Sequence, residues 1–97
     1  MPTYVTLFQW TEQGVRNIKD ASARFAAAKK LVENSGGKVL GLYVTMGPYD
    51  VVAVTEGPSD EAASAAALSI ASKGNAKTMT MRAFTENEFA GILTKVS

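Results

Sequence analysis

Four segments of this chain have the alternating hydrophobic pattern of β-strands, and two longer segments between them have the periodicity of amphipathic helices. The strands are expected at residues 3–10, 38–46, 50–56 and 77–84, and the helices at about 20–35 and 60–73. This β-α-β-β-α-β order allows one antiparallel sheet with both helices on the same face, which is the ferredoxin-like split arrangement. We therefore predict an α+β fold, a ferredoxin-like sandwich.

Turn and capping residues stand where this order requires the chain to change direction. Gly36-Gly37 ends the first helix, and Gly47-Pro48 forms a structural turn between the second and third strands, which read as a hairpin. Thr85 and Glu88 fit the capping box of a further helix. The apolar residues of that helix are Phe89, Ile92 and Leu93. The sandwich should therefore carry an added C-terminal helix.

Composition narrows the possible chemistry. The chain has 97 residues, which predicts a single domain over residues 1–97, and 46% of them are hydrophobic. It contains no Cys and no His. Thiolate nucleophiles, imidazole bases and Cys/His metal sites are therefore excluded, and we expect no metal and no cofactor.

Charge and hydropathy limit the expected partners. Ten Lys and Arg residues are balanced by nine Asp and Glu residues, and no basic cluster stands out, so nucleic acid is not an expected partner. The most apolar stretch, residues 62–71, is far shorter than the roughly 20 residues that span a bilayer, so we expect no membrane contact. The N-terminus has no pattern of a signal peptide, and we expect a cytoplasmic protein.

The two faces of the expected sheet differ in their side chains. One face collects aliphatic residues suited to packing under the helices, namely Val5, Leu7, Leu40, Leu42, Val44, Met79 and Met81. The other face collects threonines together with Tyr4, Phe8, Gly41, Tyr43, Arg82 and Phe84. The third strand is apolar on both sides, and its pattern does not orient it. Because large exposed apolar patches mark interaction sites, we predict a homodimer or higher oligomer in which two aromatic faces enclose a pocket.

Four residues of the aromatic face are candidates for binding a small hydrophobic or anionic ligand, namely Tyr4, Phe8, Tyr43 and Arg82. Aromatic rings stack on planar ligands, and an arginine binds anions. The alternative is structural. The rings would then form the core of a dimer interface, and Arg82 would pair with a carboxylate across it or extend into solvent.

Tyr49 and Asp50, after the Gly47-Pro48 turn, are the weak catalytic candidates. Asp50 could act as a base or hydrogen-bond acceptor at a pocket mouth, with Tyr49 as a wall or proton donor. The alternative is turn chemistry, in which the Asp side chain caps nearby backbone N–H groups. The direction of the Asp50 side chain, toward its own loop or into a cavity, distinguishes the two.

Several spaced blocks of the sequence resemble the GYD domain family. The longest is GLYVTMGPYD at residues 41–50, in which Gly47, Tyr49 and Asp50 match the cluster that gives the family its name. Further resembling blocks lie at residues 4–7, 10–11, 14–17, 56–58 and 82–86. The resemblance implies a small bacterial or archaeal protein of the dimeric α/β-barrel type.

That superfamily contains cofactor-independent oxygenases, haem-degrading enzymes, stress-induced proteins and effector-binding domains, so kinship selects no chemistry. No paired acid and base stand at an informative spacing in this chain. We therefore favour a homodimeric small-molecule-binding or assembly module with an interface pocket of Tyr, Phe, Thr and Arg. The alternative is a cofactor-independent enzyme, an oxygenase or isomerase acting on a small hydrophobic or aromatic metabolite.

Overall fold

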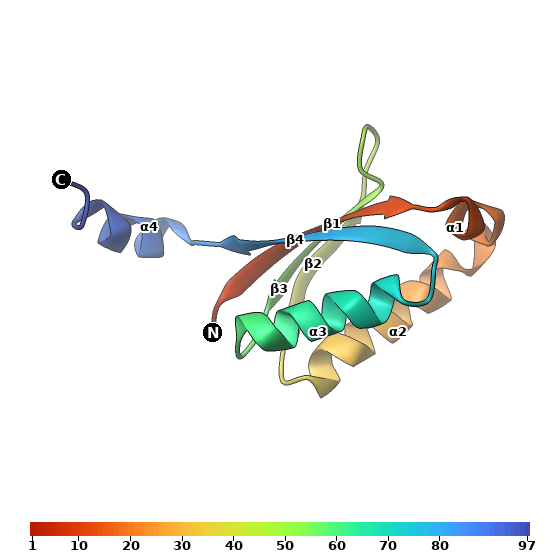
Figure 1. Cartoon of the computed structure of the whole chain (residues 1–97), viewed down its shortest axis with the longest axis horizontal. Helices are drawn as coiled ribbons and strands as arrows, with labels where there is room; N and C mark the ends of the chain where they lie inside the picture. Colours follow the sequence, from red (N-terminus) through yellow and green to blue (C-terminus); the bar gives the residue numbers. More distant parts are fainter.

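The computed structural model describes all 97 residues, and its strands and long helices follow the order expected from the sequence, with a short helix and a 3-10 turn added after the first strand (Figure 1). The strands are β1 (Thr3–Trp10), β2 (Lys38–Val44), β3 (Val51–Glu56) and β4 (Ala76–Ala83). The helices are α1 (Glu12–Arg16), α2 (Ala21–Asn34), α3 (Asp60–Ala71) and α4 (Glu86–Leu93), with a 3-10 turn, η1 (Ile18–Asp20), before α2. The predicted ferredoxin-like α+β sandwich with an added C-terminal helix is confirmed.

The four strands form one antiparallel sheet in the order β2-β3-β1-β4. The strand β1 is central, so that Val5 lies opposite Val54 of β3 on one side and Met81 of β4 on the other. The pairing of β2 with β3 shifts between Val39 and Gly41, which marks a bulge. The two edges of the sheet are therefore β2 and β4.

Side-chain caps fix the starts of the last two helices. The Ser59 hydroxyl accepts the N–H of Ala62 at 3.1 Å and caps α3. At α4, Thr85 accepts the N–H of Glu88, and the Glu88 carboxylate accepts the N–H of Thr85 at 2.8 Å. This is the capping box that the sequence predicts.

The helices α2 and α3 cover one face of the sheet, and no helix lies over the other (Figure 1). The covered face holds the buried side chains of the core, which are Tyr4, Thr6, Val51 and Ala53. Toward this face α3 presents small side chains, among them Ala62, Ala63, Ala66 and Ala67. Small side chains let the helix sit close to the large side chains of the sheet.

The sequence-based assignment of the two sheet faces was wrong for β1 and β4. Tyr4 and Phe8, expected on the uncovered face, lie under the helices together with Thr6 and Thr80. The alanines of α3 leave room there for aromatic rings, and the polar groups satisfy one another. The Tyr4 hydroxyl donates to Asp60 at 2.5 Å, and the hydroxyls of Thr6 and Thr80 lie 3.1 Å apart. Hydrogen-bonded polar groups of this kind carry little penalty when buried.

The bulge in β2 changes the expected alternation of that strand as well. Both Val39 and Leu42 line the space under the helices, although they have opposite parity in the sequence. Leu40, which the pattern placed with Leu42, is 47% exposed. One extra residue in a strand is enough to reverse the faces of the residues beyond it.

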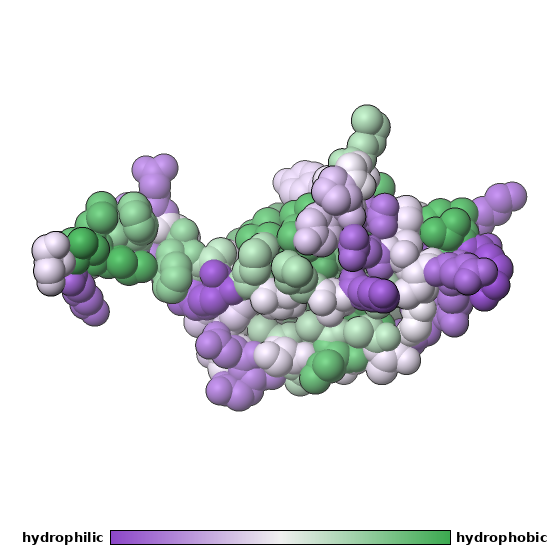
Figure 2. Space-filling view, turned by 45° about the horizontal axis from the view of Figure 1, so that its top comes forward, coloured by the Kyte–Doolittle hydropathy of each residue, from purple (hydrophilic) through white to green (hydrophobic).

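The uncovered side of the sheet, called the outer face below, is a continuous aliphatic surface. It is formed by Val5, Leu7, Val52, Val54, Met79 and Met81, which the strand register places side by side. Met79 is 50% exposed and Met81 is 42% exposed. Tyr43, opposite Val52, extends this surface onto β2 and is 61% exposed. Hydrophobic atoms are visible here beside the β2–β3 loop (Figure 2).

The C-terminal helix α4 stands away from the sandwich (Figure 1). It follows the edge strand β4 and extends the molecule to 50 × 30 × 18 Å. Its apolar residues include Phe89 and Leu93, which are 52% and 53% exposed. No helix of the protein combines the length and apolar character needed to cross a membrane.

Candidate functional site

The space between the sheet and the two long helices contains two adjoining hollows, called the helix-side cleft below. The smaller hollow has a volume of about 60 Å³ and the larger about 190 Å³. Both are lined by Phe8, Ala28, Leu42 and Ile70, so they form one cleft. The larger hollow is also lined by Trp10, Arg24, Phe25, Ala27, Leu31, Val51, Lys73, Asn75 and Ala76. Apolar concavities with a few polar groups are the usual form of small-molecule sites.

One polar group of the smaller hollow, the Tyr4 hydroxyl, is already engaged. The Tyr4 hydroxyl donates to Asp60, and this hydrogen bond, followed by desolvation of the ring, raises the pKa of Tyr4. A phenol whose pKa is raised stays protonated near neutral pH and acts as a hydrogen-bond donor, not as a base. This corner of the cleft can position a ligand, but Tyr4 does not act there as a base.

The structure separates the four predicted ligand-binding residues. Tyr4 and Phe8 line the helix-side cleft, whereas Tyr43 lies on the outer face. Arg82 lies opposite Tyr4 in the register, with its guanidinium 5.8 Å from the centre of the Tyr4 ring and 4.6 Å from that of Phe84. A single pocket of all four residues on the outer face is therefore not formed, because β1 and β4 are turned the other way.

Arg82 joins β4 to the C-terminal helix. Its guanidinium lies 3.7 Å from the carboxylate of Glu88, and it also donates to the backbone oxygens of Ala83 and Thr3. The hydrogen bond from the Thr85 N–H is the main cause that lowers the pKa of Glu88, and the Arg82 charge adds to it. The arginine thus has a carboxylate partner within its own chain, where the sequence suggested a partner across an interface.

The loop that carries the weak catalytic candidates is tied to the end of β1. The Asp50 carboxylate accepts the N–H of Trp10 at 2.8 Å, and the Asp50 N–H donates to the Phe8 oxygen at 2.8 Å. The Thr45 hydroxyl donates to the Tyr49 oxygen at 2.7 Å. The Asp50 carboxylate points neither to its own loop nor into the cleft but caps a backbone N–H of β1, which is a structural role of the same kind as turn chemistry. A catalytic role for Tyr49 and Asp50 stays a prediction.

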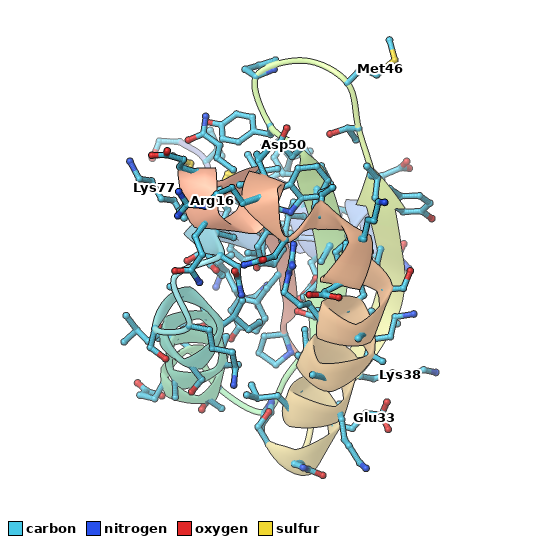
Figure 3. The ribbon with its side chains drawn as sticks, turned by 90° about the vertical axis from the view of Figure 1, so that its right-hand side faces the viewer. Arg16, Glu33, Lys38, Met46, Asp50 and Lys77 are labelled. Carbon is cyan, nitrogen blue, oxygen red and sulfur yellow. The ribbon has the colours of Figure 1, made fainter.

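Gly47 supplies the backbone conformation that this loop needs. Its φ of +116° lies in the region that favours glycine. Pro48 follows it, and its carbonyl accepts a hydrogen bond from the Gln9 side chain at 2.9 Å. Figure 3 shows Asp50 at the base of the loop and Met46 at its tip. The loop is therefore anchored at its base and free at its end.

Sequence reasoning missed the cations beside the cleft, Arg24 of α2 and Lys73 after α3. One signal was available for the arginine. Arg24, Ala28 and Leu31 have the i, i+4, i+7 spacing of one helix face, so the charge shares a side with apolar residues. No comparable pattern marks Lys73, because it lies beyond the end of its helix.

The structure brings together no group of three or more acidic side chains suited to hold a metal ion. A sheet covered on one side by two helices, with an apolar cleft between the layers, defines a small α+β domain. The chain belongs to the GYD domain family, whose model matches residues 4–93. The family to which the sequence blocks pointed is thereby confirmed.

One relative and two solved structures show how far this likeness extends. The relative is the glutamine synthetase and cystathionine beta-lyase binding protein of Thermus thermophilus, 33% identical over 84 residues, which are 86% of this chain and 88% of the relative. The solved structure of TTHA0845, also from Thermus thermophilus, has a TM-score of 0.57 and 23% identity, covering 88% of this chain and 95% of that one. The structure of FFRP-DM1 has a TM-score of 0.60 and 19% identity, covering 87% and 100%. At these identities the solved structures show the fold alone.

Proposed function

We propose that this chain is a non-catalytic binding protein that assembles as a homodimer through its outer face and docks onto a metabolic enzyme through α4. One observation carries the proposal: a chain of 97 residues leaves two separate apolar surfaces exposed, one on the sheet and one on the C-terminal helix. Surfaces of this kind mark interaction sites in soluble proteins.

The outer face fits a second copy of the chain. Its residues are aliphatic along β3, β1 and β4, and the register sets them in rows: Val52, Leu7 and Met79, then Val54, Val5 and Met81. A two-fold interface requires a surface that is complementary to itself, and a surface of uniform aliphatic character can pack against its own copy. Two sheets packed face to face would interleave these side chains as in a sandwich core.

The α4 helix fits a different protein. Its capping box and the Arg82–Glu88 ion pair stabilise the helix and join it to β4. Its apolar side chains Phe89 and Leu93 nevertheless remain half exposed. A capped helix with an unpacked apolar stripe has the form of a segment that lies in a groove of a partner.

The relative in Thermus thermophilus supports a role in which this chain binds other proteins, because that relative's name describes it as binding glutamine synthetase and cystathionine beta-lyase. The chemistry of the cleft supports binding over catalysis. Tyr4, the phenol that lines the cleft, donates to Asp60, and its raised pKa keeps it protonated near neutral pH. Asp50 lies outside the lining of the cleft, and its carboxylate accepts the N–H of Trp10.

The test uses purified chain and purified glutamine synthetase and cystathionine β-lyase from the same organism, with binding followed by surface-immobilised interferometry. The double variant Phe89→Ala/Leu93→Ala removes the apolar stripe of α4. We expect it to weaken binding by about 100-fold, because two half-exposed side chains contribute about 1–1.5 kcal/mol each.

The matched control is Val15→Ala in α1, an exposed aliphatic residue (56%) at the opposite end of the molecule. It should leave the affinity unchanged. Absence of binding to both enzymes would refute the docking proposal. Equal affinities of wild type and double variant would refute the role of α4.

A further inference from the structure

We propose that the helix-side cleft binds a small apolar carboxylate, with the apolar part enclosed between the sheet and α2 and the carboxylate directed to Arg24 and Lys73. Ligand binding in this cleft is separate from the proposed docking function, which uses the outer face and α4. The inference depends on the juxtaposition of an apolar hollow with two cations and no acid in its lining.

The size and walls of the hollow define the apolar part of the ligand. The larger hollow measures about 190 Å³. An apolar cavity of about 150 Å³ is known to hold one benzene ring. Phe8, Phe25 and Trp10 stand among its walls, and aromatic walls favour flat or branched apolar groups. One ring with a short chain therefore fits this space.

The charges define the polar part. Neither Arg24 nor Lys73 takes part in either ion pair of the chain. The Arg24 guanidinium donates to the backbone oxygens of Asn17 at 2.7 Å and Gly14 at 3.3 Å, which hold it in place without neutralising it. Lys73 follows the C-terminal end of α3, whose dipole offsets part of the lysine charge. Arg24 therefore supplies the greater share of the attraction for an anion.

The positions of the two cations support the same assignment. Figure 3 looks onto the end of the molecule where α1 lies across the top and α2 and α3 stand on either side. One cation comes from α2 and the other from the turn two residues after the end of α3, so they flank the cleft from two parts of the chain. In that view Lys77 points outward, away from the space between α2 and α3. It is therefore a suitable control for charge alone.

The experiment compares three probes of one shape and three charges: 3-phenylpropionate, 3-phenylpropanol and 3-phenylpropylamine. The single tryptophan of the chain, Trp10, lines the cleft, so its fluorescence reports occupancy directly. We expect the carboxylate to bind about tenfold more tightly than the alcohol and the amine to bind most weakly, because hydrogen bonds to a charged partner are the stronger ones. Added salt should reduce the advantage of the carboxylate.

Two pairs of variants place the probe. Lys73→Gln should weaken carboxylate binding about two- to fivefold, as expected for a partly exposed charge, while Lys77→Gln leaves it unchanged. Ala28→Leu should fill the cleft and abolish binding of all three probes, while Ala26→Leu, on the exposed side of α2, does not. If Ala28→Leu fails to fold, the Lys73 pair and the probe series still decide.

Equal affinities for the three probes would overturn the assignment of an anion. No change in Trp10 fluorescence at millimolar probe would overturn the cleft as a binding site. Carboxylate binding that Lys73→Gln and a correctly folded Ala28→Leu both leave intact would place the probe elsewhere and also overturn the proposal. None of these results depends on docking to an enzyme, so failure here and failure of the proposed function are distinguishable.

Discussion

Truncation of the two methionines of the outer face should dissociate the proposed dimer. Burying a methionine side chain fully is worth about 1.5–3 kcal/mol. Met79 is 50% exposed and Met81 is 42% exposed in the single chain, so roughly half of that value remains to be gained by each on association. A two-fold interface contains four such side chains, and their loss in Met79→Ala/Met81→Ala costs about 3–6 kcal/mol. At about 1.4 kcal/mol per tenfold, the dissociation constant should rise about 10²- to 10⁴-fold.

Sedimentation equilibrium over a dilution series measures this constant directly. Leu68→Ala is the control, because Leu68 is 70% exposed on α3, the helix that covers the opposite face of the sheet. Far-ultraviolet circular dichroism checks that the double variant keeps its fold. A wild-type mass of one chain at micromolar concentration would refute the dimer. A dissociation constant shared by wild type and double variant would refute the outer face as its interface.

Three further predictions concern stability. Gly14→Ala should lower the free energy of unfolding by about 1–3 kcal/mol in denaturant, because a Cβ there would lie 2.1 Å from the Asn75 oxygen. Gly91→Ala in α4 should raise it by about 0.5–1 kcal/mol, because a Cβ there meets nothing within 4 Å. An equal effect of the two variants would contradict the packing. Because the pKa of Tyr4 is raised in the folded chain, the protonated phenol stabilises the fold below pH about 10, and this stabilisation is lost as the pH rises through the raised pKa. The melting temperature should therefore fall more steeply at alkaline pH in wild type than in Tyr4→Phe. Because the pKa of Glu88 is lowered in the folded chain, its carboxylate stabilises α4 above the usual pKa of a glutamate, and this stabilisation is lost on acidification. Glu88→Gln keeps an acceptor for the capping box and should remove the acid dependence of the helical chemical shifts of α4 in NMR spectra.

The fold was predictable from the sequence because local signals agree with it. Alternation marked each strand, and the glycines and caps marked the ends of the helices. The capping box of Thr85 and Glu88 is a local motif, since both of its hydrogen bonds lie within four residues. Signals that act over a few residues are read directly from a sequence.

The choice of the covered face was not predictable in the same way. Both sides of β1 are apolar enough to be buried, so hydrophobic alternation gives no preference between them. The decision rests on partners distant in the chain, namely the Tyr4–Asp60 and Thr6–Thr80 hydrogen bonds and the alanines of α3. The location of the candidate site differs from the prediction for the same reason, because Tyr4 and Phe8 line the helix-side cleft whereas Tyr43 lies on the outer face.

The residues that carry the family signature have a structural effect on the helix-side cleft. Asp50 holds the N–H of Trp10 and the carbonyl of Phe8, and both of these residues line the larger hollow. The glycine conformation at Gly47 lets the loop turn back so that Asp50 reaches β1. The signature thereby fixes one wall of the cleft, while the Asp50 carboxylate is itself bonded to the backbone of β1. For the proposed carboxylate ligand, selectivity would then come from residues outside the signature, namely the cations Arg24 and Lys73 beside the cleft.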